Sequence, residues 1–581
     1  MILQALVQHY EDLAAKGAIA PPGWGPAKVS FALYLDGNGE LTRVVSVKTE
    51  QTRGKKTALQ PQIMRVPEPV KRSSGIAANF LCDNAGYMLG ADNKGNPQRT
   101  RDCFAACKAL HEALLTGVDS PAAAAVLAFF RNWNPDTALE HPALQEARDD
   151  ILGGANLVFR HVGQYVHEDA AVRTAWQAHY DTSGDGPCMT CLVTGKQAPI
   201  AQLHPSIKGV RGAQSSGASL VSFNADSFCS YNRKQGLNAP TSKYAAFAYG
   251  TALNHLIADW EHTGYMGNTL VLFWASGGET AYQDVFSGFA FDTDTPYSPD
   301  DLRKMVLSLV SGNPVVYDET RLNPAQDFYI LGLAPNAARL SVRFFLHNSF
   351  GQFLEHLLAH QQRLEIIHSA DSKFTTLPLW RLLYETVNQN TKDKSPSPVL
   401  EGELLRAILT NTHYPATLLN GVTLRIRAER DITWGRAAIL KAYYLQHPHS
   451  DIPKEVLTVS LNPDSTNIPY TLGRLFSVLE AIQFKANPGI NATIKDKYFN
   501  AAAATPAHIF PTLVNLAQKH LRKLKEGQKI YYSNQLQTLF SILGETFPTR
   551  LNLPQQGAFQ LGYYHQTQER YQSKNKEENK S

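Results

Sequence analysis

The segment from His204 to Tyr244 combines the residue types that proteins use to contact nucleic acid. Its glycines and serines interleave with phenylalanines and tyrosines. It contains one acidic residue, Asp226, and five basic residues: Lys208, Arg211, Arg233, Lys234 and Lys243. Basic groups neutralise phosphates, aromatic rings stack on bases, and glycine lets the backbone approach a ligand closely. The segment therefore predicts a loop that contacts DNA or RNA. The alternative is an ordered connector whose glycines and serines only form turns.

Cys188 and Cys191 have the CxxC spacing of zinc sites and of thiol redox sites. A structural zinc ion needs about four ligands. The nearest further candidates, His204 and Cys229, do not stand at a standard spacing. We therefore expect a reduced structural pair and no bound metal, with a zinc site as the alternative left open.

The motifs of the common catalytic classes are absent from the sequence. There is no GxxxxGK(S/T) loop, no GxGxxG turn after a strand and no GxSxG elbow. Glu355 precedes both His356 and His360, whereas the HExxH metalloprotease motif has its acid between the histidines. We therefore expect a protein that is not an enzyme and needs no cofactor. A metal-dependent nuclease or RNA-processing enzyme is the alternative, because scattered carboxylates leave no visible motif.

Positive charge is concentrated in two further regions. Residues 43–72 contain eight basic and two acidic residues, and residues 461–581 contain fourteen and eight, although the whole chain carries a net charge of only +4. Two separate basic regions indicate two contacts with a polyanion. The alternative is ordinary solvated surface charge.

The hydrophobic pattern predicts an α+β fold. Alternating residues predict hairpins at 30–47 and 327–345 and a buried strand at 268–275, whereas helical spacing predominates after residue 346. We expect three domains: an α+β domain at 1–186 with DNA contacts, a middle α+β domain at 187–345, and a helical region at 346–581. Within the last, residues 463–565 predict a compact helical bundle and residues 566–581 a disordered tail.

The chain carries the features of a cytoplasmic protein. Six cysteines in 581 residues do not form a disulfide framework. The N-terminus predicts an amphipathic helix and not a signal peptide, and no apolar run reaches the roughly 18 residues that span a bilayer. We expect cytoplasmic localisation and no membrane contact.

Several segments in order resemble one protein family, the large subunit of the type I-C CRISPR Cascade, an RNA-guided DNA surveillance complex. The likeness runs from MILQALVQHYEDLAAKG at the N-terminus to the last helices. It rests on the segment 204–244 and on TEQTRGKKT, RSSGIAANFLCDNAGYMLG, CLVTG, FYILGLAPNAARLSVRFF, LRIRAERDITWGRAAILKAYY and NPGINATIKDKYF.

The resemblance implies a non-catalytic role in DNA recognition. Members of this family read the short protospacer-adjacent motif (PAM) on duplex DNA, help to open the duplex into an R-loop, stabilise the displaced strand and dock a helicase–nuclease. The implied partners are the guide RNA, the target double-stranded DNA, the subunit that binds the guide's 5′ handle, the backbone subunits, the small subunits and the helicase–nuclease. The C-terminal bundle is expected to be similar to the small subunit. A purely structural scaffold is a further alternative.

We expect three groups of residues to contact nucleic acid, since guide pairing carries most specificity and the protein reads only a short motif. The residues expected on the PAM side are Lys71, Arg72, Ser73, Asn79, Asn84, Gln214, Ser215, Asn224, Asn232, Arg233 and Lys234. The residues expected to hold phosphates are Arg53, Lys55, Lys56, Lys208 and Arg211. The residues expected to follow the displaced or target strand are Arg425, Arg427, Arg430, Lys519, Arg522 and Lys523.

Overall fold

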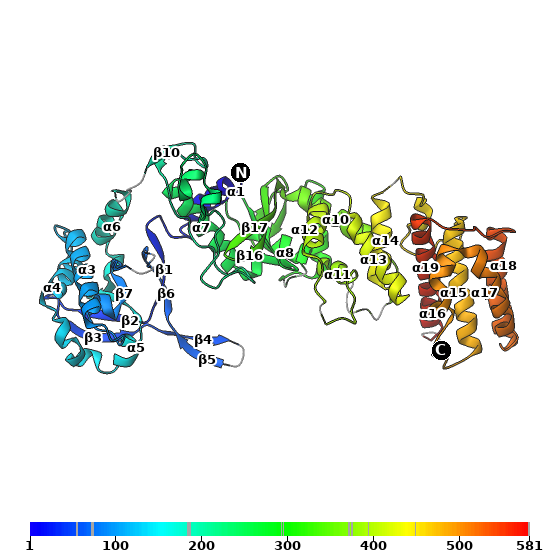
Figure 1. Cartoon of the computed structure of the whole chain (residues 1–581), viewed down its shortest axis with the longest axis horizontal. Coiled ribbons are helices and arrows are strands. Elements are labelled where there is room, and N and C mark those ends of the chain that lie inside the picture. The colour runs from blue at the N-terminus through cyan, green and yellow to red at the C-terminus, as the bar shows by residue number, and fades with distance from the viewer. Residues whose placement is uncertain are drawn as a thin grey trace. The chain divides into compact units, whose positions relative to one another are not determined.

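The computed structural model describes residues 1–53, 56–70, 72, 75–182, 187–291, 293, 295–369, 372, 376–392, 394–447 and 449–578. The chain forms two compact units: residues 1, 3–205 and 222–252 make the first, and residues 2, 206–221 and 253–581 the second. Both units contain helices, and the strands include the expected hairpins, which confirms the α+β class (Figure 1). The three-domain division stays a prediction.

A five-stranded sheet organises the first unit. Its strands are ordered β3 (Leu41–Ser46), β2 (Phe31–Leu35), β8 (Asn156–His161) and β7 (Cys82–Asn84), with β9 (Gln164–Tyr165) beside β8. The predicted hairpin is confirmed as β2–β3, and the Asp36 carboxylate closes its turn by accepting the Asn38 and Glu40 amides at 2.9 and 2.8 Å. The β2–β8 pair is parallel and joins segments far apart in the chain.

Each face of this sheet has its own cover. Phe31, Leu33 and Leu35 share a core with α3 (Pro97–Leu115) and α4 (Pro121–Asn132). Ala32, on the other face, packs with β1 (Trp24–Val29) and β6 (Gln62–Pro67), which form a two-stranded ribbon. That ribbon continues into the hairpin of β4 (Thr49–Arg53) and β5 (Lys56–Gln60) (Figure 1).

Helix–helix and short-strand contacts complete the first unit. Tyr10 of α1 (Ile2–Ala15) lies edge-on to Phe247 of α7 (Lys243–Ala258), with ring centroids 5.7 Å apart. The Tyr244 hydroxyl donates to Glu11 at 3.0 Å. The remaining elements include α2 (Ala85–Met88), α5 (Arg148–Leu152), α6 (Ala170–Thr182) and the pair β10 (Cys188–Thr190) and β11 (Gln197–Pro199).

The second unit begins with a four-stranded antiparallel sheet. Its order is β12 (Thr263–Met266), β13 (Thr269–Ala275), β16 (Asp327–Asn336) and β17 (Arg339–Ser349). Every residue of β13 is buried, which confirms the predicted buried strand. The predicted β16–β17 hairpin is also confirmed, and Ala337 makes its turn with a φ of 51°.

Helices fill the rest of the second unit, as the sequence predicted beyond residue 346. The sheet shares its core with α8 (Ala281–Phe291), α9 (Pro299–Val310) and α10 (Phe350–Leu364). A hairpin of β14 (Val315–Tyr317) and β15 (Thr320–Leu322) precedes β16. Beyond α10 lie α11 (Leu379–Tyr384), α12 (Pro398–Leu409), α13 (Ala416–Glu429) and α14 (Trp434–Leu445).

The C-terminal bundle is built on a close crossing of two helices. Its members are α15 (Ile468–Ala486), α16 (Ile494–Ala504), α17 (Pro506–Leu521), α18 (Glu526–Leu543) and α19 (Leu553–Glu578) (Figure 1). A Cβ atom on Gly473 of α15 would lie 1.9 Å from the Phe559 carbonyl oxygen, and one on Gly562 of α19 would lie 2.0 Å from the Tyr470 carbonyl oxygen. Only glycine permits this approach of the two backbones.

Part of the region predicted as a disordered tail is helical. Helix α19 continues through Glu578, and its polar residues bond to α15. The Arg474 guanidinium donates to Gln566 at 3.1 Å, and the Ser477 and Thr567 hydroxyls lie 2.7 Å apart. Gln566 and Thr567 are therefore held against α15, although their polar composition predicts solvation.

Substituting either crossing glycine is expected to destabilise the bundle. Gly473→Ala or Gly562→Ala would force the two backbones apart, at a cost of about 3 kcal/mol in the free energy of unfolding. Gly527→Ala in α18 is the matched control, since its Cβ would meet nothing within 4 Å and alanine favours helix. Chemical denaturation of the three variants measures the difference. Equal stability for all three would contradict the crossing.

Candidate nucleic-acid interface

The first predicted PAM-side loop is built around an internal ion pair. The Arg72 guanidinium bonds to both carboxylate oxygens of Asp83, donates to the Ala77 carbonyl oxygen at 2.5 Å and stacks 4.0 Å from the Tyr87 ring. Asp83 is only 1% exposed, so its charge needs this partner. Arg72 is therefore held by its own chain. Lys71 and Ser73 lie outside the described residues.

Asn79 and Asn84 belong to the same framework. The Asn79 side-chain oxygen accepts a hydrogen bond of 2.9 Å from the Val70 backbone amide. The Asn79 backbone amide donates to the Asp83 carboxylate at 2.9 Å. The Asn84 side-chain oxygen accepts the Gly86 amide at 3.1 Å and caps α2. Base reading would require these side-chain oxygens to exchange their present partners. The base-reading roles expected for Arg72, Asn79 and Asn84 stay predictions.

Loss of Arg72 is expected to lower the stability of the folded protein, in addition to any effect on DNA binding. Arg72→Ala would leave Asp83 buried without its partner, lowering the free energy of unfolding by about 3 kcal/mol. Arg72→Lys should not restore the lost stability, because a lysine cannot form the bidentate contact with the Asp83 carboxylate. Arg101→Ala is the control, since its pair with Asp136 is exposed and worth less than about 1 kcal/mol. An Arg72→Ala protein of unchanged stability would contradict a structural role.

The second predicted loop is divided between the two units. Residues 206–221 belong to the second unit and residues 222–252 to the first. In the second unit, Ile207 and Ala218 exchange two backbone hydrogen bonds of 2.8 Å, and the Asn254 side chain fastens the Lys208 amide at 2.8 Å. Four of the predicted side chains are exposed on this braced loop: Lys208, Arg211, Gln214 and Ser215. Neither Lys208 nor Arg211 forms an ion pair with any residue that the structure describes.

The part of the loop in the first unit carries the other predicted PAM-side residues. Asn224, Asn232, Arg233 and Lys234 are all exposed. Asn232, Arg233 and Lys234 are consecutive, and the Arg233 amide closes a turn by donating to the Ser230 carbonyl oxygen at 3.0 Å. Within the described ranges, Arg233 and Lys234 form no salt bridge. The two segments thus offer cations that the fold itself does not use.

The residues expected to follow a DNA strand differ in availability. Arg425 and Arg427 lie in helix α13. Arg425 lies 3.6 Å from Glu429, Arg427 donates to Gln556 at 2.9 Å, and Arg430 ends the helix with a φ of 54°. Arg425 and Arg427 therefore already have partners within the chain.

Three basic residues of the bundle that are expected to follow a DNA strand lie at or just beyond the C-terminal end of α17. The helix ends at Leu521, Arg522 is its C-terminal cap residue, and Lys523 follows it. Lys523 donates to the Asn487 side chain at 3.1 Å, whereas Lys519 and Arg522 are exposed. Cations are favourable at this end of a helix because its carbonyl groups carry partial negative charge.

Two of the residues expected to hold phosphates lie on the β4–β5 hairpin. Arg53 and Lys56 are the last paired residues of these strands. Lys55 lies outside the described residues.

The first unit has a further basic cluster, and its member Arg160 lies outside the basic regions predicted from the sequence. The Arg43 guanidinium lies 4.1 Å and the Arg160 guanidinium 5.3 Å from the centre of the Tyr34 ring, and Arg160 also donates to the Tyr34 hydroxyl at 2.8 Å. Neither arginine pairs with a carboxylate in the described part of the chain. Tyr34 and Arg43 are neighbours across the predicted hairpin, but Arg160 joins them only through the parallel β2–β8 pair.

The CxxC residues occupy different environments. Cys188 is exposed, whereas Cys191 is buried and its sulfur accepts the Thr194 and Ser242 amides at 3.4 and 3.2 Å. Burial alone would raise the pKa of Cys191, but hydrogen bonds from the side chains and backbone amides of Ser242 and Thr194 lower it to about 7. No group of three or more histidine, cysteine or acidic side chains that could hold a metal occurs among the described residues. Cys191 therefore fastens the CLVTG turn to the start of α7.

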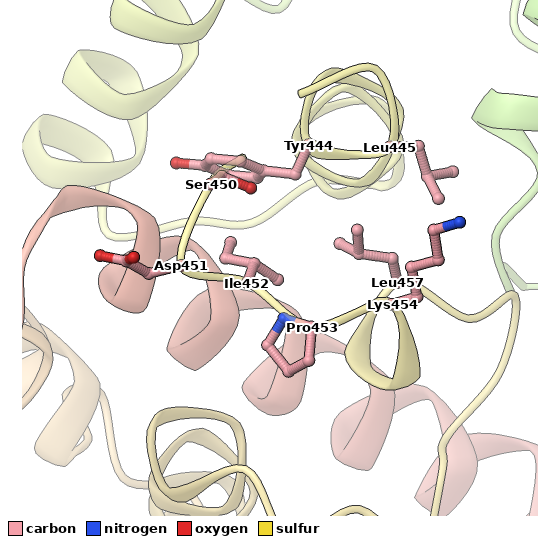
Figure 2. Close-up of a pocket in the computed structure, with 8 residues that line it drawn as sticks. All are labelled: Tyr444, Leu445, Ser450, Asp451, Ile452, Pro453, Lys454 and Leu457. Atoms are coloured by element: carbon pink, nitrogen blue, oxygen red, sulfur yellow. The ribbon is translucent and has the colours of Figure 1, made fainter. Parts of the chain in front are cut away.

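One cavity of about 370 Å³ lies in the second unit, between the end of α14 and the segment 450–457. Figure 2 shows the Asp451 carboxylate and the Lys454 ammonium at opposite sides of the lining, pointing apart. Asp451 also accepts a hydrogen bond of 2.8 Å from Asn552. The lining therefore does not bring an acid and a base together.

Comparison with known proteins identifies the family. The family model described as CRISPR-associated protein (Cas_Csd1) matches residues 6–571. The chain belongs to this family. The match confirms the resemblance to a Cascade large subunit. It also implies that this protein acts in the context of a CRISPR complex. No curated protein matches the chain. In the part of this Cas_Csd1 protein that the structure describes, no helix is long and apolar enough to cross a membrane.

Proposed function

We propose that this protein is a non-catalytic DNA-recognition subunit of a type I-C Cascade complex. It reads the PAM on duplex DNA, assists opening of the R-loop, stabilises the displaced strand and docks the helicase–nuclease. Its partners are the guide RNA, the subunit that binds the guide's handle, the backbone subunits and the small subunits, in the cytoplasm. The observation that supports this proposal best is that the two loop segments, 206–221 and 222–244, expose cations with no acidic partner among the residues that the structure describes.

The two kinds of exposed side chain on the second-unit loop suit different tasks. Lys208 and Arg211 can neutralise phosphates, which fixes the register of the protein on the duplex without reading sequence. Gln214 and Ser215 can hydrogen-bond to base edges, and a glutamine suits the donor and acceptor of adenine. Because the loop backbone is fixed by Asn254 and by the Ile207–Ala218 bonds, little conformational entropy is lost on binding.

The basic side chains outside these loops suit contacts with the opened strands. Lys519 and Arg522 project from the end of α17, and Arg43 and Arg160 lie on the sheet of the first unit. Each of these groups can hold one or two phosphates without sequence preference. They are therefore proposed to stabilise separated strands, whereas the loop residues act on the duplex.

Separate variants of the loop are expected to have separate effects in the assembled complex. Lys208→Ala or Arg211→Ala should weaken binding equally for all duplexes and reduce the salt slope by about one. Gln214→Ala should instead reduce discrimination between duplexes that differ only in the flanking motif, by about 1–3 kcal/mol. Lys94→Ala, which removes an exposed lysine outside both loops, is the control. Titrations at several salt concentrations measure both quantities.

Two outcomes would overturn the proposal. Metal-dependent cleavage of DNA or RNA by the pure chain, abolished by substitution of one carboxylate, would make it an enzyme. Normal assembly of the complex with no salt-dependent DNA binding by the chain would make it a scaffold.

A further inference from the structure

The turn at Ser230–Arg233 exposes an aromatic ring whose residue has a backbone conformation that is unfavourable for tyrosine. Tyr231 is 94% exposed, and Tyr231 and Asn232 have φ angles of 53° and 56°. Positive φ at both central positions is the pattern of primed turns, which glycine, asparagine and aspartate dominate. Asn232 suits its position, but a tyrosine in the left-handed region is strained and gains nothing from burial here. Strain held at an exposed side chain is a feature of functional contacts.

Hydrogen bonds hold the two ends of the 230–236 loop, so the turn cannot relieve its backbone strain by moving as a whole. The Asn238 side chain accepts the Ser230 amide at 2.8 Å and donates to the Arg233 and Gln235 carbonyl oxygens at 3.0 and 2.9 Å. The Gly236 amide donates to the Gln202 carbonyl oxygen at 3.0 Å. A Cβ atom on Gly236 would lie 2.1 Å from the Ala201 carbonyl oxygen. The ring of Tyr231 is therefore presented by a rigid base.

The charges beside the ring indicate what it contacts. Arg233 and Lys234 follow directly, are exposed and form no ion pair with the described residues. The only acid between residues 222 and 244 is Asp226. A planar ring flanked by cations and an amide matches a ligand with flat faces and a chain of negative charges. A nucleic acid has both, whereas an apolar protein surface has neither.

We propose that Tyr231 stacks on an unpaired base where the duplex ends or opens, while Arg233 and Lys234 hold the adjoining phosphates. This inference rests on the proposed function and adds a specific role to it. Stacking accepts any base, so Tyr231 favours opened DNA without reading sequence. Motif reading and strand opening are thereby assigned to different side chains.

The test uses the assembled complex and two DNA substrates with the same motif. One is fully paired, and the other has two unpaired bases beside the motif. Wild type is expected to prefer the opened substrate, and Tyr231→Ala to lose about 5- to 100-fold of its affinity for that substrate while keeping its affinity for paired DNA. Tyr231→Phe should retain the preference, because the ring is kept.

A second variant separates binding from folding. Asparagine tolerates positive φ, so Tyr231→Asn should be at least as stable as wild type and yet lose the preference for opened DNA. An undiminished preference in Tyr231→Ala, or a loss in Tyr231→Phe equal to that in Tyr231→Ala, would overturn the role of the ring. Loss of a partner subunit from Tyr231→Ala, with DNA binding intact, would also overturn it and indicate a protein contact. Wild type that binds neither substrate would overturn the proposed function itself.

Discussion

Close contact between glycine and backbone carbonyl groups is the constraint on which much of this protein depends. Gly473 and Gly562 bring α15 and α19 together, and Gly236 seats its loop against Ala201. At each of these contacts a single added methyl group would force the two backbone segments apart. At the Gly236 loop this contact needs no charged side chain, so the backbone is fixed while Arg233 and Lys234 are left for other partners.

The cations of the chain consequently fall into two classes. Arg72 and Arg425 have acidic partners within the chain, and Arg72 is required to neutralise a buried carboxylate. Lys208, Arg211 and Arg233 stand on braced backbones, exposed and without an acid in the described ranges. The net charge of a segment cannot distinguish these classes, since both contribute equally to it. The chain belongs to a CRISPR-associated family, and nucleic acid is the partner proposed for this second class.

Local features of the fold could be predicted from the sequence, because alternation and turn residues act over a few positions. The β2–β3 and β16–β17 hairpins and the buried strand β13 are examples. The role of Arg72 could not, because an arginine in a serine- and glycine-rich loop has the appearance of a ligand contact. Its partner Asp83 is buried only through contacts that fold around it. The parallel β2–β8 pair and the ordered start of the tail depend in the same way on distant segments.

The crossing of α15 and α19 also has a consequence for biosynthesis. Phe476 of α15 packs against Phe559 and Tyr563 of α19, with ring centroids 6.1 and 6.0 Å apart. Because α15 ends at Ala486 and α19 begins at Leu553, a ribosome must translate 66 further codons after α15 before it reaches the partner helix. During that interval the α15 surface is uncovered, and premature termination before α19 would leave it permanently open to aggregation or to chaperones.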